Sequence, residues 1–470
     1  MTDIALLSMT ELAAAYRDKS LTPSAVIGHT LERISKLDPK LGAFEIVTAD
    51  RAVAAADAAT KAIASGHRIG PFHGIPFALK DLVDFEGLIT TGGTNAKATN
   101  VATSTATIAA RLIAGGGILI GKTKTVEVAY GAWGTNTRRG TPWNPWDATT
   151  HRTPGGSSSG SGVAVASGMA SCAIGTDTGG SVRIPAGWCG IVGLKVTEGR
   201  LPLEGIVPLS HTLDTPGPMA RTVADATLMY ETLLGRPPDA IDADIAAGSG
   251  LYGQINAGVA GLRMGALSAV AREGVDAAVL ADYDAALARL KALGAEIVTF
   301  DLPVSASDMA RGVGMIISAE GYYHHGSLYE DPANAMDEHV RPRIMAGAKI
   351  SARDYVAVRQ QMQTNRRATL AAMHDAKLAV FLTPTITTPP VPVADADQTK
   401  TPAGFTRAVN YLGFCAMSVP MGLAGANLPT GLPTSLHVVA RGGDEAMAIR
   451  VSGAFERDRG PFPPPPMALG

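Results

Sequence analysis

Residues 154–200 read PGGSSSGSGVAVASGMASCAIGTDTGGSVRIPAGWCGIVGLKVTEGR, and the rest of the chain is organised around this stretch. Glycine and serine are dense in it, as in a flexible linker, but a linker of that kind is polar throughout. Here the small residues alternate with large apolar ones such as Val163, Ile174 and Leu194. This mixture indicates a backbone that packs tightly against a core, so the stretch is predicted to be folded and buried.

Two serine clusters bracket the apolar part of the stretch, GGSSSG at 155–160 and TDTGGS at 176–181. Glycine pairs let the backbone turn sharply. Such turns leave N–H groups free to point at a ligand, and consecutive free N–H groups form a concavity that binds anions. A hydroxyl beside such a concavity is what acyl transfer requires, because the nucleophile attacks a carbonyl and the donors stabilise the oxyanion.

A serine nucleophile needs a base, and the residues leave two kinds open. None of the ten histidines lies in a stretch typical of a catalytic triad, although folding can bring a distant histidine close. A buried lysine also serves, because desolvation disfavours its ammonium form. Residues 72–81 (FHGIPFALKD) form an apolar, strand-like run with Lys80 near its end. The side chain of a lysine in that position either extends to water or stays buried because it has a functional role.

At this point the chain resembles the amidase signature family of serine amidohydrolases. Three motifs carry the resemblance: GIPFALK at 74–80, GGSSSG at 155–160 and GTDTGGSVRIPA at 175–186. These motifs are long and specific, and the likeness extends over nearly the whole chain. The resemblance implies one α/β domain over residues 1–470, an α/β/α sandwich around a large twisted mixed β-sheet.

The resemblance also implies a Ser–Ser–Lys triad. Ser181 is then the nucleophile, Ser157 relays the proton from an unusual cis peptide, and neutral Lys80 is the base. The implied oxyanion hole consists of the backbone N–H groups of Thr178, Gly179, Gly180 and Ser181. This chemistry needs no metal and no organic cofactor.

Several neighbours of the triad are predicted to support it. Asp177 and Arg183 flank the nucleophile loop, and we expect them to hold its backbone, or to form a structural ion pair, rather than to take part in the chemistry. Ser158 supports the first cluster, in which Ser159 stands where the family often has glycine.

Residues 126–146 are the candidate wall of a substrate pocket. Gly131 and Trp133 are the predicted substrate-binding residues, because pockets favour aromatic side chains with a few polar groups. The alternative is a buried turn that aromatic residues pack together.

Composition argues against several other classes of protein. The 470 residues carry a formal net charge of −2, which weighs against a nucleic-acid surface and against binding to anionic membranes. The start, MTDIALLSMTEL, lacks the basic region of a signal peptide. The apolar run that comes nearest to a membrane span, 159–176, is rich in Gly, Ser and Ala. Three cysteines without metal-ligand spacing fit a reducing compartment, so the expected location is the cytoplasm.

The order of elements divides the single domain into five regions. N-terminal helices are expected over 9–66, the catalytic core over 70–235, and an α/β portion over 260–458, where strands and helices alternate. The Pro-, Asp- and Ala-rich residues 237–250 are predicted to form a mobile surface loop. Residues 460–470 (GPFPPPPMALG) are predicted to be a loose or surface-hugging tail.

Two patterns point to other ligands and are set aside. Residues 116–123 (GGILIGKT) match a phosphate-binding P-loop, but that site needs a strand, a loop of free N–H groups and then a helix. Here an apolar strand runs through the supposed loop, so we expect a helix-to-strand turn with Lys122 at the surface. The cluster Tyr322, Tyr323, His324 and His325 lacks an evident third metal ligand and is expected to lie at the surface or at a pocket rim.

These observations predict hydrolysis of a C–N acyl bond through an acyl-enzyme. The expected partner is a small-molecule substrate, either an amide, an aryl amide or a carbamate, with no nucleic acid and no membrane, and the family implies a homodimer. One alternative is a component of an aminoacyl-tRNA amidotransferase that releases ammonia from glutamine; Ile184 in Arg-Ile-Pro, where that branch has Arg-Gln-Pro, weighs against it. The other is a non-catalytic ligand-binding protein, and the intact set Lys80, Ser157 and Ser181 weighs against that interpretation.

Overall fold

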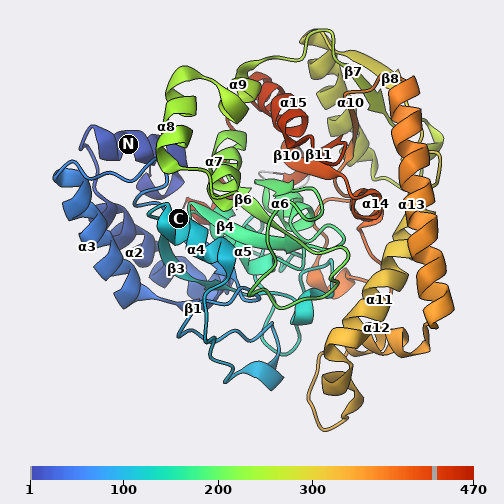
Figure 1. The fold of residues 1–470 in the computed structure, drawn as a ribbon, viewed down its shortest axis with the longest axis horizontal. Helices are drawn as coiled ribbons and strands as arrows, with labels where there is room; N and C mark the ends of the chain where they lie inside the picture. The colour runs from blue at the N-terminus through green and yellow to red at the C-terminus, as the bar shows by residue number, and fades with distance from the viewer. Residues whose placement is uncertain (1–2, 426–430, 470) are drawn as a thin grey trace.

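The chain is built around one mixed β-sheet, seen in a computed structural model that describes residues 3–425 and 431–469 (Figure 1). The ends of the predicted domain and tail, residues 1–2 and 470, lie outside the described residues. The sheet has eleven strands in the order β1-β3-β2-β4-β6-β5-β10-β11-β9-β7-β8. The strands are β1 (Phe44–Val47), β2 (Pro76–Lys80), β3 (Ile118–Thr123), β4 (Cys172–Asp177), β5 (Val192–Lys195), β6 (Thr215–Ala220), β7 (Arg263–Ala266), β8 (Glu296–Thr299), β9 (Val380–Pro384), β10 (Cys415–Ala424) and β11 (Leu432–Ala440).

Strand direction changes along the sheet. β2 runs parallel to both β3 and β4, and β7 runs parallel to β8 and β9. The strands between these two groups, from β4 through β6, β5, β10 and β11 to β9, pair antiparallel. Because Leu79 of β2 pairs with Ile174 of β4, Lys80 at the end of β2 lies beside the end of β4. The register of two parallel strands thus sets the position of the predicted base.

Helices cover both faces of the sheet. They are α1 (Met9–Arg17), α2 (Pro23–Leu41), α3 (Ala49–Ala64), α4 (Thr107–Ala114), α5 (Ser159–Ala166), α6 (Arg183–Cys189), α7 (Val223–Leu233), α8 (Pro238–Ala247), α9 (Gly250–Asn256), α10 (Ala277–Ala292), α11 (Ala306–Glu330), α12 (Arg341–Met345), α13 (Ala352–Asp375), α14 (Gly404–Leu412) and α15 (Glu445–Arg459). Alternate residues of a strand point to opposite faces. Phe77 and Leu79 therefore enter one apolar core, shared with α4, α7 and α15, while Ala78 enters another, shared with α5. The predicted α/β/α sandwich is confirmed.

The helical face opposite the main core is divided in two. Helix α5 covers β2, β3, β4 and β6, whereas α6 covers β5, β10 and β11, and both helices contribute to one cluster of buried residues. Helices α11, α12, α13 and α14 pack together in another cluster beside β9 to β11. In Figure 1 this second group lies on the right, in yellow to red, at a distance from the blue N-terminal helices.

Residues 237–250 are helical, and their prediction as a mobile loop is wrong. Pro238 opens α8, a position where proline fits because the first helical N–H has no partner in any case. Gly248 ends the helix in the left-handed conformation, with φ of +60°. Between them Ile241 is buried in the main core. The proline and glycine that indicate a loop in the sequence are the two boundaries of a short helix.

The C-terminal segment 460–469 packs on the body of the protein. The Phe462 ring lies 5.7 Å from the Trp146 ring, measured between centroids. Pro466–Ala468 forms a 3-10 turn, and Arg33 of α2 donates a hydrogen bond to the Ala468 carbonyl. Of the two predicted states, loose or surface-hugging, the structure has the second. Phe462 is partly buried and Pro465 and Ala468 are buried, so several residues of the segment contribute to this packing.

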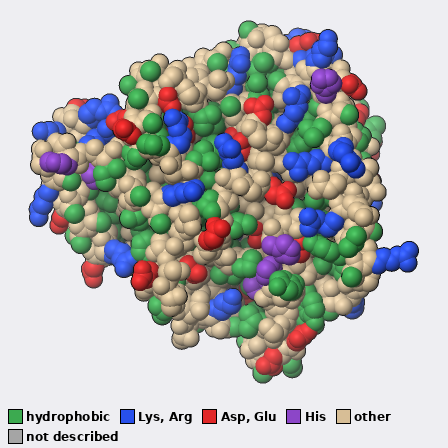
Figure 2. All heavy atoms as spheres, in the orientation of Figure 1, with side chains coloured by type: hydrophobic (Ala, Val, Ile, Leu, Met, Phe, Trp, Pro, Cys, Tyr) green, Lys and Arg blue, Asp and Glu red, His purple; other side chains and the backbone are tan. Residues whose placement is uncertain are grey.

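Acidic and basic side chains are mixed over the face shown in Figure 2, without a large patch of one sign. This distribution agrees with the balanced composition. Within residues 3–425 and 431–469, no helix has both the length and the apolar character that a bilayer crossing requires.

Candidate active site

Lys80 is completely buried at the end of β2. Its Nζ atom donates hydrogen bonds to Ser157 Oγ at 2.7 Å and to Thr176 Oγ1 at 2.8 Å. Burial lowers the pKa of Lys80 to about 7, although the charges of Asp214 and Asp177 act in the opposite direction. A lysine with such a pKa is partly neutral near neutral pH, and the neutral amine is the form that accepts a proton.

Ser157 follows a glycine that no other residue could replace. The Gly156–Ser157 peptide is cis, as the resemblance implied. A Cβ atom on Gly156 would lie 2.5 Å from the Gly131 carbonyl oxygen, so no side chain fits there. The Ser157 carbonyl accepts hydrogen bonds from Val126 N–H at 3.1 Å and from Thr125 Oγ1 at 3.0 Å. These contacts hold the Ser157 hydroxyl against Lys80.

Ser181 lies between β4 and α6, in the wall of a cavity of about 240 Å³. The residue is 8 % exposed, whereas Ser157 is fully buried. Ser158 N–H donates to the Ser181 carbonyl at 3.3 Å, which joins the two serine clusters. Ser158 Oγ accepts from Thr176 N–H at 3.2 Å, so this side chain ties the first cluster to β4, as its supporting role predicted. The three predicted residues come from three separate motifs; Lys80 contacts Ser157, and the next residue, Ser158, bonds the backbone of Ser181.

The nucleophile loop has fewer free donors than the sequence predicts. Gly180 N–H donates to Asp177 Oδ1 at 2.7 Å, and this bond removes Gly180 from the predicted oxyanion hole. The N–H groups of Thr178, Gly179 and Ser181 have no acceptor among the described residues, and all three residues line the cavity. These three are therefore the donors that remain for an oxyanion.

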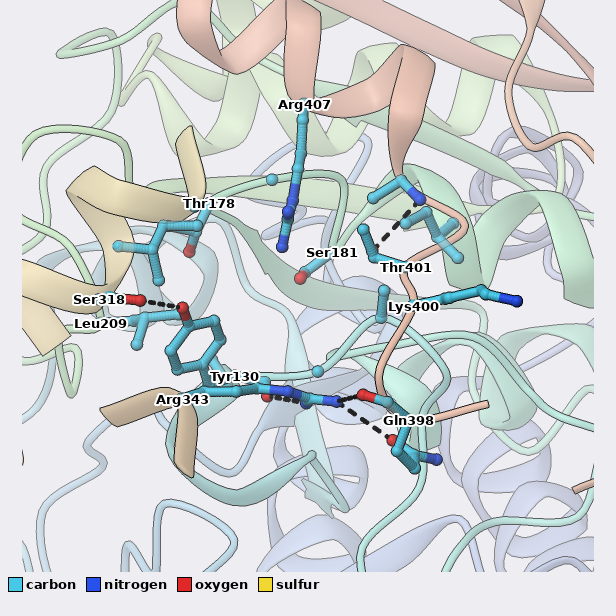
Figure 3. A pocket seen from close by; sticks show the side chains of 18 of the residues that line it. Tyr130, Thr178, Ser181, Leu209, Ser318, Arg343, Gln398, Lys400, Thr401 and Arg407 are labelled. Atoms are coloured by element: carbon cyan, nitrogen blue, oxygen red, sulfur yellow. Dashed lines mark hydrogen bonds between the residues drawn. The ribbon is translucent and has the colours of Figure 1, made fainter. Parts of the chain in front are cut away.

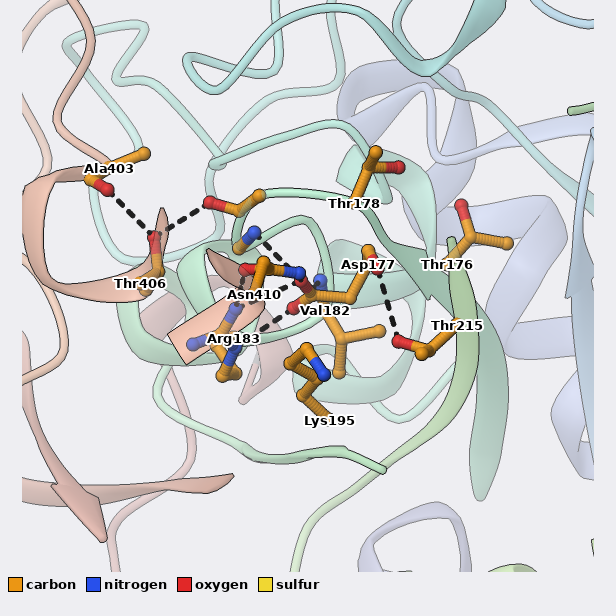
Figure 4. A network of polar contacts seen from close by, with 12 residues as sticks. Thr176, Asp177, Thr178, Val182, Arg183, Lys195, Thr215, Ala403, Thr406 and Asn410 are labelled. Carbon is orange, nitrogen blue, oxygen red and sulfur yellow. Dashed lines mark hydrogen bonds and ion pairs between the residues drawn. The ribbon is translucent and has the colours of Figure 1, made fainter. Parts of the chain in front are cut away.

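Asp177 and Arg183 form a fully buried ion pair below the loop (Figure 4). Arg183 donates to both carboxylate oxygens of Asp177 at 2.9 Å, and Asn410 Nδ2 donates to Oδ1 at the same distance. Burial acts to raise the pKa of Asp177, but the Arg183 charge holds it well below its usual range. The carboxylate also accepts Val182 N–H at 3.1 Å. The pair thus fixes the backbone on both sides of Ser181, and neither residue lines the cavity.

A buried histidine completes this network without serving Ser181. Arg183 Nη1 lies 3.0 Å from His437 Nε2, and burial holds the pKa of His437 well below its usual value. A neutral His437 accepts this hydrogen bond through Nε2. The structure therefore places one histidine in contact with the supporting ion pair, where sequence reasoning had found none.

Lys122 is buried, and the prediction that it lies at the surface is wrong. It stands on β3, and the face of the sheet to which its side chain points is covered, with the Ile89 carbonyl accepting from its Nζ atom at 2.8 Å. Its Nζ atom lies 2.7 Å from Asp81 Oδ1 and donates to Thr90 Oγ1 at 2.6 Å. Because Asp81 directly follows Lys80, this ion pair anchors the end of the strand that carries the base. The rejection of a P-loop here agrees with the strand at 118–123.

Besides the nucleophile loop and the start of α6, the cavity is lined by residues from five parts of the chain: 129–132, 209, 314–318, 343 and 398–407 (Figure 3). Gly131 lines it, as predicted, but Trp133 does not. The Trp133 ring stacks on Trp188 with centroids 5.6 Å apart, and its indole N–H donates to the carbonyls of Asp397 and Lys400 at 3.1 Å. Trp133 thus packs against another aromatic ring, as in the alternative of an aromatic-packed turn, but it is only partly buried.

Outside Gly131 and the nucleophile loop, no lining side chain was predicted individually from the sequence, although Tyr130 lies in the candidate wall at 126–146. The missed lining side chains include Tyr130, Leu209, Ser318, Arg343, Gln398, Thr401 and Arg407. Tyr130 OH bonds Ser318 Oγ at 2.8 Å, and Arg343 donates to the carbonyls of Tyr130 and Gln398 at 2.8 and 2.7 Å. These residues belong to no motif and meet only through the packing of α11, α12 and α14. Of these residues, only Tyr130 lies in the wall that the sequence predicted at 126–146.

The cluster at 322–325 is divided between surface and core. The Tyr323 side chain is 78 % exposed, while His325 is buried and its Nε2 lies 2.7 Å from the Pro208 carbonyl oxygen. In the part of the chain that the structure describes, no group of three or more His, Cys, Asp or Glu residues is arranged to hold a metal ion.

Comparison with known proteins gives the same assignment. The amidase family profile matches residues 25–449. The chain is 36 % identical to 2-amino-5-chloromuconic acid deaminase of Comamonas testosteroni, over 91 % of both chains. It is 35 % identical to a glutamyl-tRNA(Gln) amidotransferase subunit of Anaeromyxobacter dehalogenans, over 99 % of this chain and 98 % of the relative. Among solved structures, the native peptide amidase of Stenotrophomonas maltophilia superposes with a TM-score of 0.84 at 28 % identity, over 98 % of each chain. The chain belongs to the amidase signature family and is an amidohydrolase that acts on C–N bonds.

Proposed function

We propose that this protein hydrolyses a small carboxylic amide through an acyl-enzyme formed on Ser181. The observation that carries the proposal is the contact between Ser157 Oγ and a buried Lys80 whose pKa is about 7, next to a cavity that contains Ser181. A cavity of about 240 Å³ favours a small substrate over a long chain.

In the proposed first half-reaction, Ser181 Oγ attacks the amide carbonyl. Its proton passes to Ser157 Oγ, and the Ser157 proton passes to neutral Lys80. The free N–H groups of Thr178, Gly179 and Ser181 stabilise the oxyanion that forms. When the C–N bond breaks, the proton held at Lys80 returns through Ser157 to the leaving nitrogen, and ammonia or an amine departs.

In the second half-reaction, water replaces the lost amine. The water oxygen attacks the acyl carbon while a water proton passes through Ser157 to Lys80. The bond between the acyl carbon and Ser181 Oγ then breaks, and the proton returns through Ser157 to Ser181 Oγ. The products are a carboxylic acid and a free amine. A carbamate has the same C–N bond next to a carbonyl, so the proposal includes carbamates. We expect them to be hydrolysed no faster than amides.

A glutaminase function within an aminoacyl-tRNA amidotransferase is the second candidate. The 35 % identity to a glutamyl-tRNA(Gln) amidotransferase chain, over nearly the full length of both proteins, favours it. The cavity weighs against it, because no Asp or Glu is among its lining residues to receive the ammonium group of glutamine. The contact between Lys80 and Ser157, next to a cavity that contains Ser181, weighs against a non-catalytic binding protein.

The test is hydrolysis of a panel of small amides, anilides, esters, carbamates and glutamine by wild type and by Ser181→Ala. We expect amine release by wild type and its loss in the variant, with a covalent acyl adduct on Ser181 visible by mass spectrometry when the reaction is quenched. Ser452→Ala is the matched control, because Ser452 is also fully buried but its hydroxyl has no partner among the described residues. Full activity in Ser181→Ala overturns the proposal, and a preference for glutamine selects the second candidate.

A further inference from the structure

Arg407 enters the cavity beside Ser181 without an acidic partner. It lies on α14, and Figure 3 shows its guanidinium pointing from that helix toward Ser181. No hydrogen bond or ion pair joins this guanidinium to another of the residues described, and the charge of Arg343 nearby opposes its own. A guanidinium is always charged in proteins, and a largely buried charge without a counter-charge is costly. Arg407 is therefore a cation without a counter-charge among the described residues, and it faces the cavity.

Gly179 makes room for this side chain, whereas a Cβ atom on Gly314 would only reach ordinary contact distance. A Cβ atom on Gly179 would lie 3.3 Å from Arg407 Cγ and 3.6 Å from Arg407 Nε. A Cβ atom on Gly314 of α11 would lie 3.7 Å from Arg407 Nη1. The stem of Arg407 thus crosses the backbone of Gly179, one of the residues with a free N–H for the oxyanion. The guanidinium is held next to the place where a substrate carbonyl has to lie.

The other cations of the cavity are already engaged. Arg343 donates to two backbone carbonyls, those of Tyr130 and Gln398. Lys400 pairs with Asp397 at 3.3 Å, and its side chain is 79 % exposed. Arg407 is consequently the one cationic lining residue, within the described chain, for which no hydrogen bond or ion pair of the side chain is found.

We propose that Arg407 binds a carboxylate of the substrate, so that the preferred substrates are small amides that carry a carboxylate besides the amide that is cleaved. This inference rests on the proposed function for the reaction, and it adds the substrate class. Guanidinium and carboxylate form two parallel charge-assisted hydrogen bonds, which fixes both the position and the orientation of the substrate. Hydrolysis of such a half-amide adds water across the C–N bond and gives a dicarboxylate and ammonia.

The kinetic test compares succinamate with neutral butyramide. For wild type we expect kcat/KM to be higher for the anion. For Arg407→Gln we expect a loss of about 30-fold or more on succinamate, the range of a hydrogen bond to a charged group, and little change on butyramide. Arg407→Lys should retain part of the preference, since it keeps the charge but not the planar fork. Arg311→Gln, which removes a 72 % exposed arginine of α11, is the control for the loss of one positive charge.

A binding measurement separates this inference from the proposed reaction. Calorimetric titration of Ser181→Ala with succinamate and with butyramide should show tighter binding of the anion, and Ser181→Ala/Arg407→Gln should lose the difference. If wild type hydrolyses neither compound but the anion still binds through Arg407, the proposed function fails and this inference stands. Equal binding of anion and neutral amide, or an equal loss on both in a folded Arg407→Gln variant, overturns the inference.

Discussion

The Nζ atom of Lys80 lies 2.7 Å from the Oγ atom of Ser157, and both side chains are completely buried. Lys80 comes from the end of a strand and Ser157 from a loop that precedes α5. The contact depends on the parallel pairing of β2 with β4, which brings the end of β2 beside Thr176. The candidate proton path is therefore part of the sheet itself.

Replacing Lys80 by methionine should abolish most of the activity while the protein stays folded. Loss of a general base costs about 10²- to 10⁴-fold in rate, and we expect kcat/KM to fall by about this factor. Stability should be retained, because methionine fills the site without the cost of burying an ammonium group. Activity assays combined with urea unfolding check both points, and a Lys80→Met protein with more than about a tenth of wild-type kcat/KM contradicts the role of Lys80.

The reaction should require a deprotonated group with a pKa of about 7. Burial lowers the pKa of Lys80 to that value, so the neutral base increases as the pH rises through about 7 and is lost as the pH falls below it. We expect kcat/KM to rise with pH and then level off. The measurement is a pH profile of kcat/KM, with circular dichroism at each pH as the control for unfolding. A flat profile from about pH 5 to about pH 9 counts against Lys80 as the base.

Asp177→Asn should destabilise the protein strongly and reduce activity with it. The substitution leaves the buried Arg183 without its counter-charge, and breaking a buried pair costs about 3–5 kcal/mol. It also weakens the contacts that fix Gly180 and Val182 on either side of Ser181. Chemical unfolding and kcat give the two readouts. Asp308→Asn, at an exposed ion pair with Arg311, is the control and should cost less than about 1 kcal/mol.

Lys122 and Asp81 should behave as a coupled pair. Lys122→Met alone leaves the Asp81 carboxylate buried without its cation, and we expect a loss of about 3–5 kcal/mol in the free energy of unfolding. In the double variant Lys122→Met/Asp81→Leu the loss should be clearly smaller than the sum of the two single losses. A double-mutant cycle by urea denaturation measures this coupling, and strictly additive losses show that the two residues are independent.

The catalytic candidates could be predicted from contiguous sequence motifs. Most side chains of the cavity wall could not, because they come together only through long-range packing. Lys80, Ser157 and Ser181 each lie in a contiguous motif, so their identities could be read before it was known that they meet. Gly180 was wrongly assigned to the oxyanion hole. A motif shows that its N–H group is present, but not that this group already donates a hydrogen bond to the Asp177 carboxylate. Arg407 is separated from Ser181 by nearly half of the chain, and only the packing of α14 against the nucleophile loop brings them together.

The remaining wrong predictions concern residues 237–250 and Lys122. Proline and glycine near 238 and 248 favour both a loop and the two ends of a short helix, and the difference depends on whether Ile241 finds a core to enter. Lys122 gave no sign of burial because the side chains that contact its Nζ atom, those of Asp81 and Thr90, are distant from it in the sequence. In both cases the deciding contact is long-range.

The cavity and the catalytic groups come from different parts of the molecule. Lys80, Ser157 and Ser181 are held by the sheet and the two serine clusters, whereas much of the surrounding wall comes from α11, α12, α14 and the segment at 398–403. A substitution in that wall therefore changes which molecule is admitted without moving the groups that handle the proton. Such a division lets natural variation change the substrate repertoire of this scaffold in small steps, each of which leaves a working enzyme.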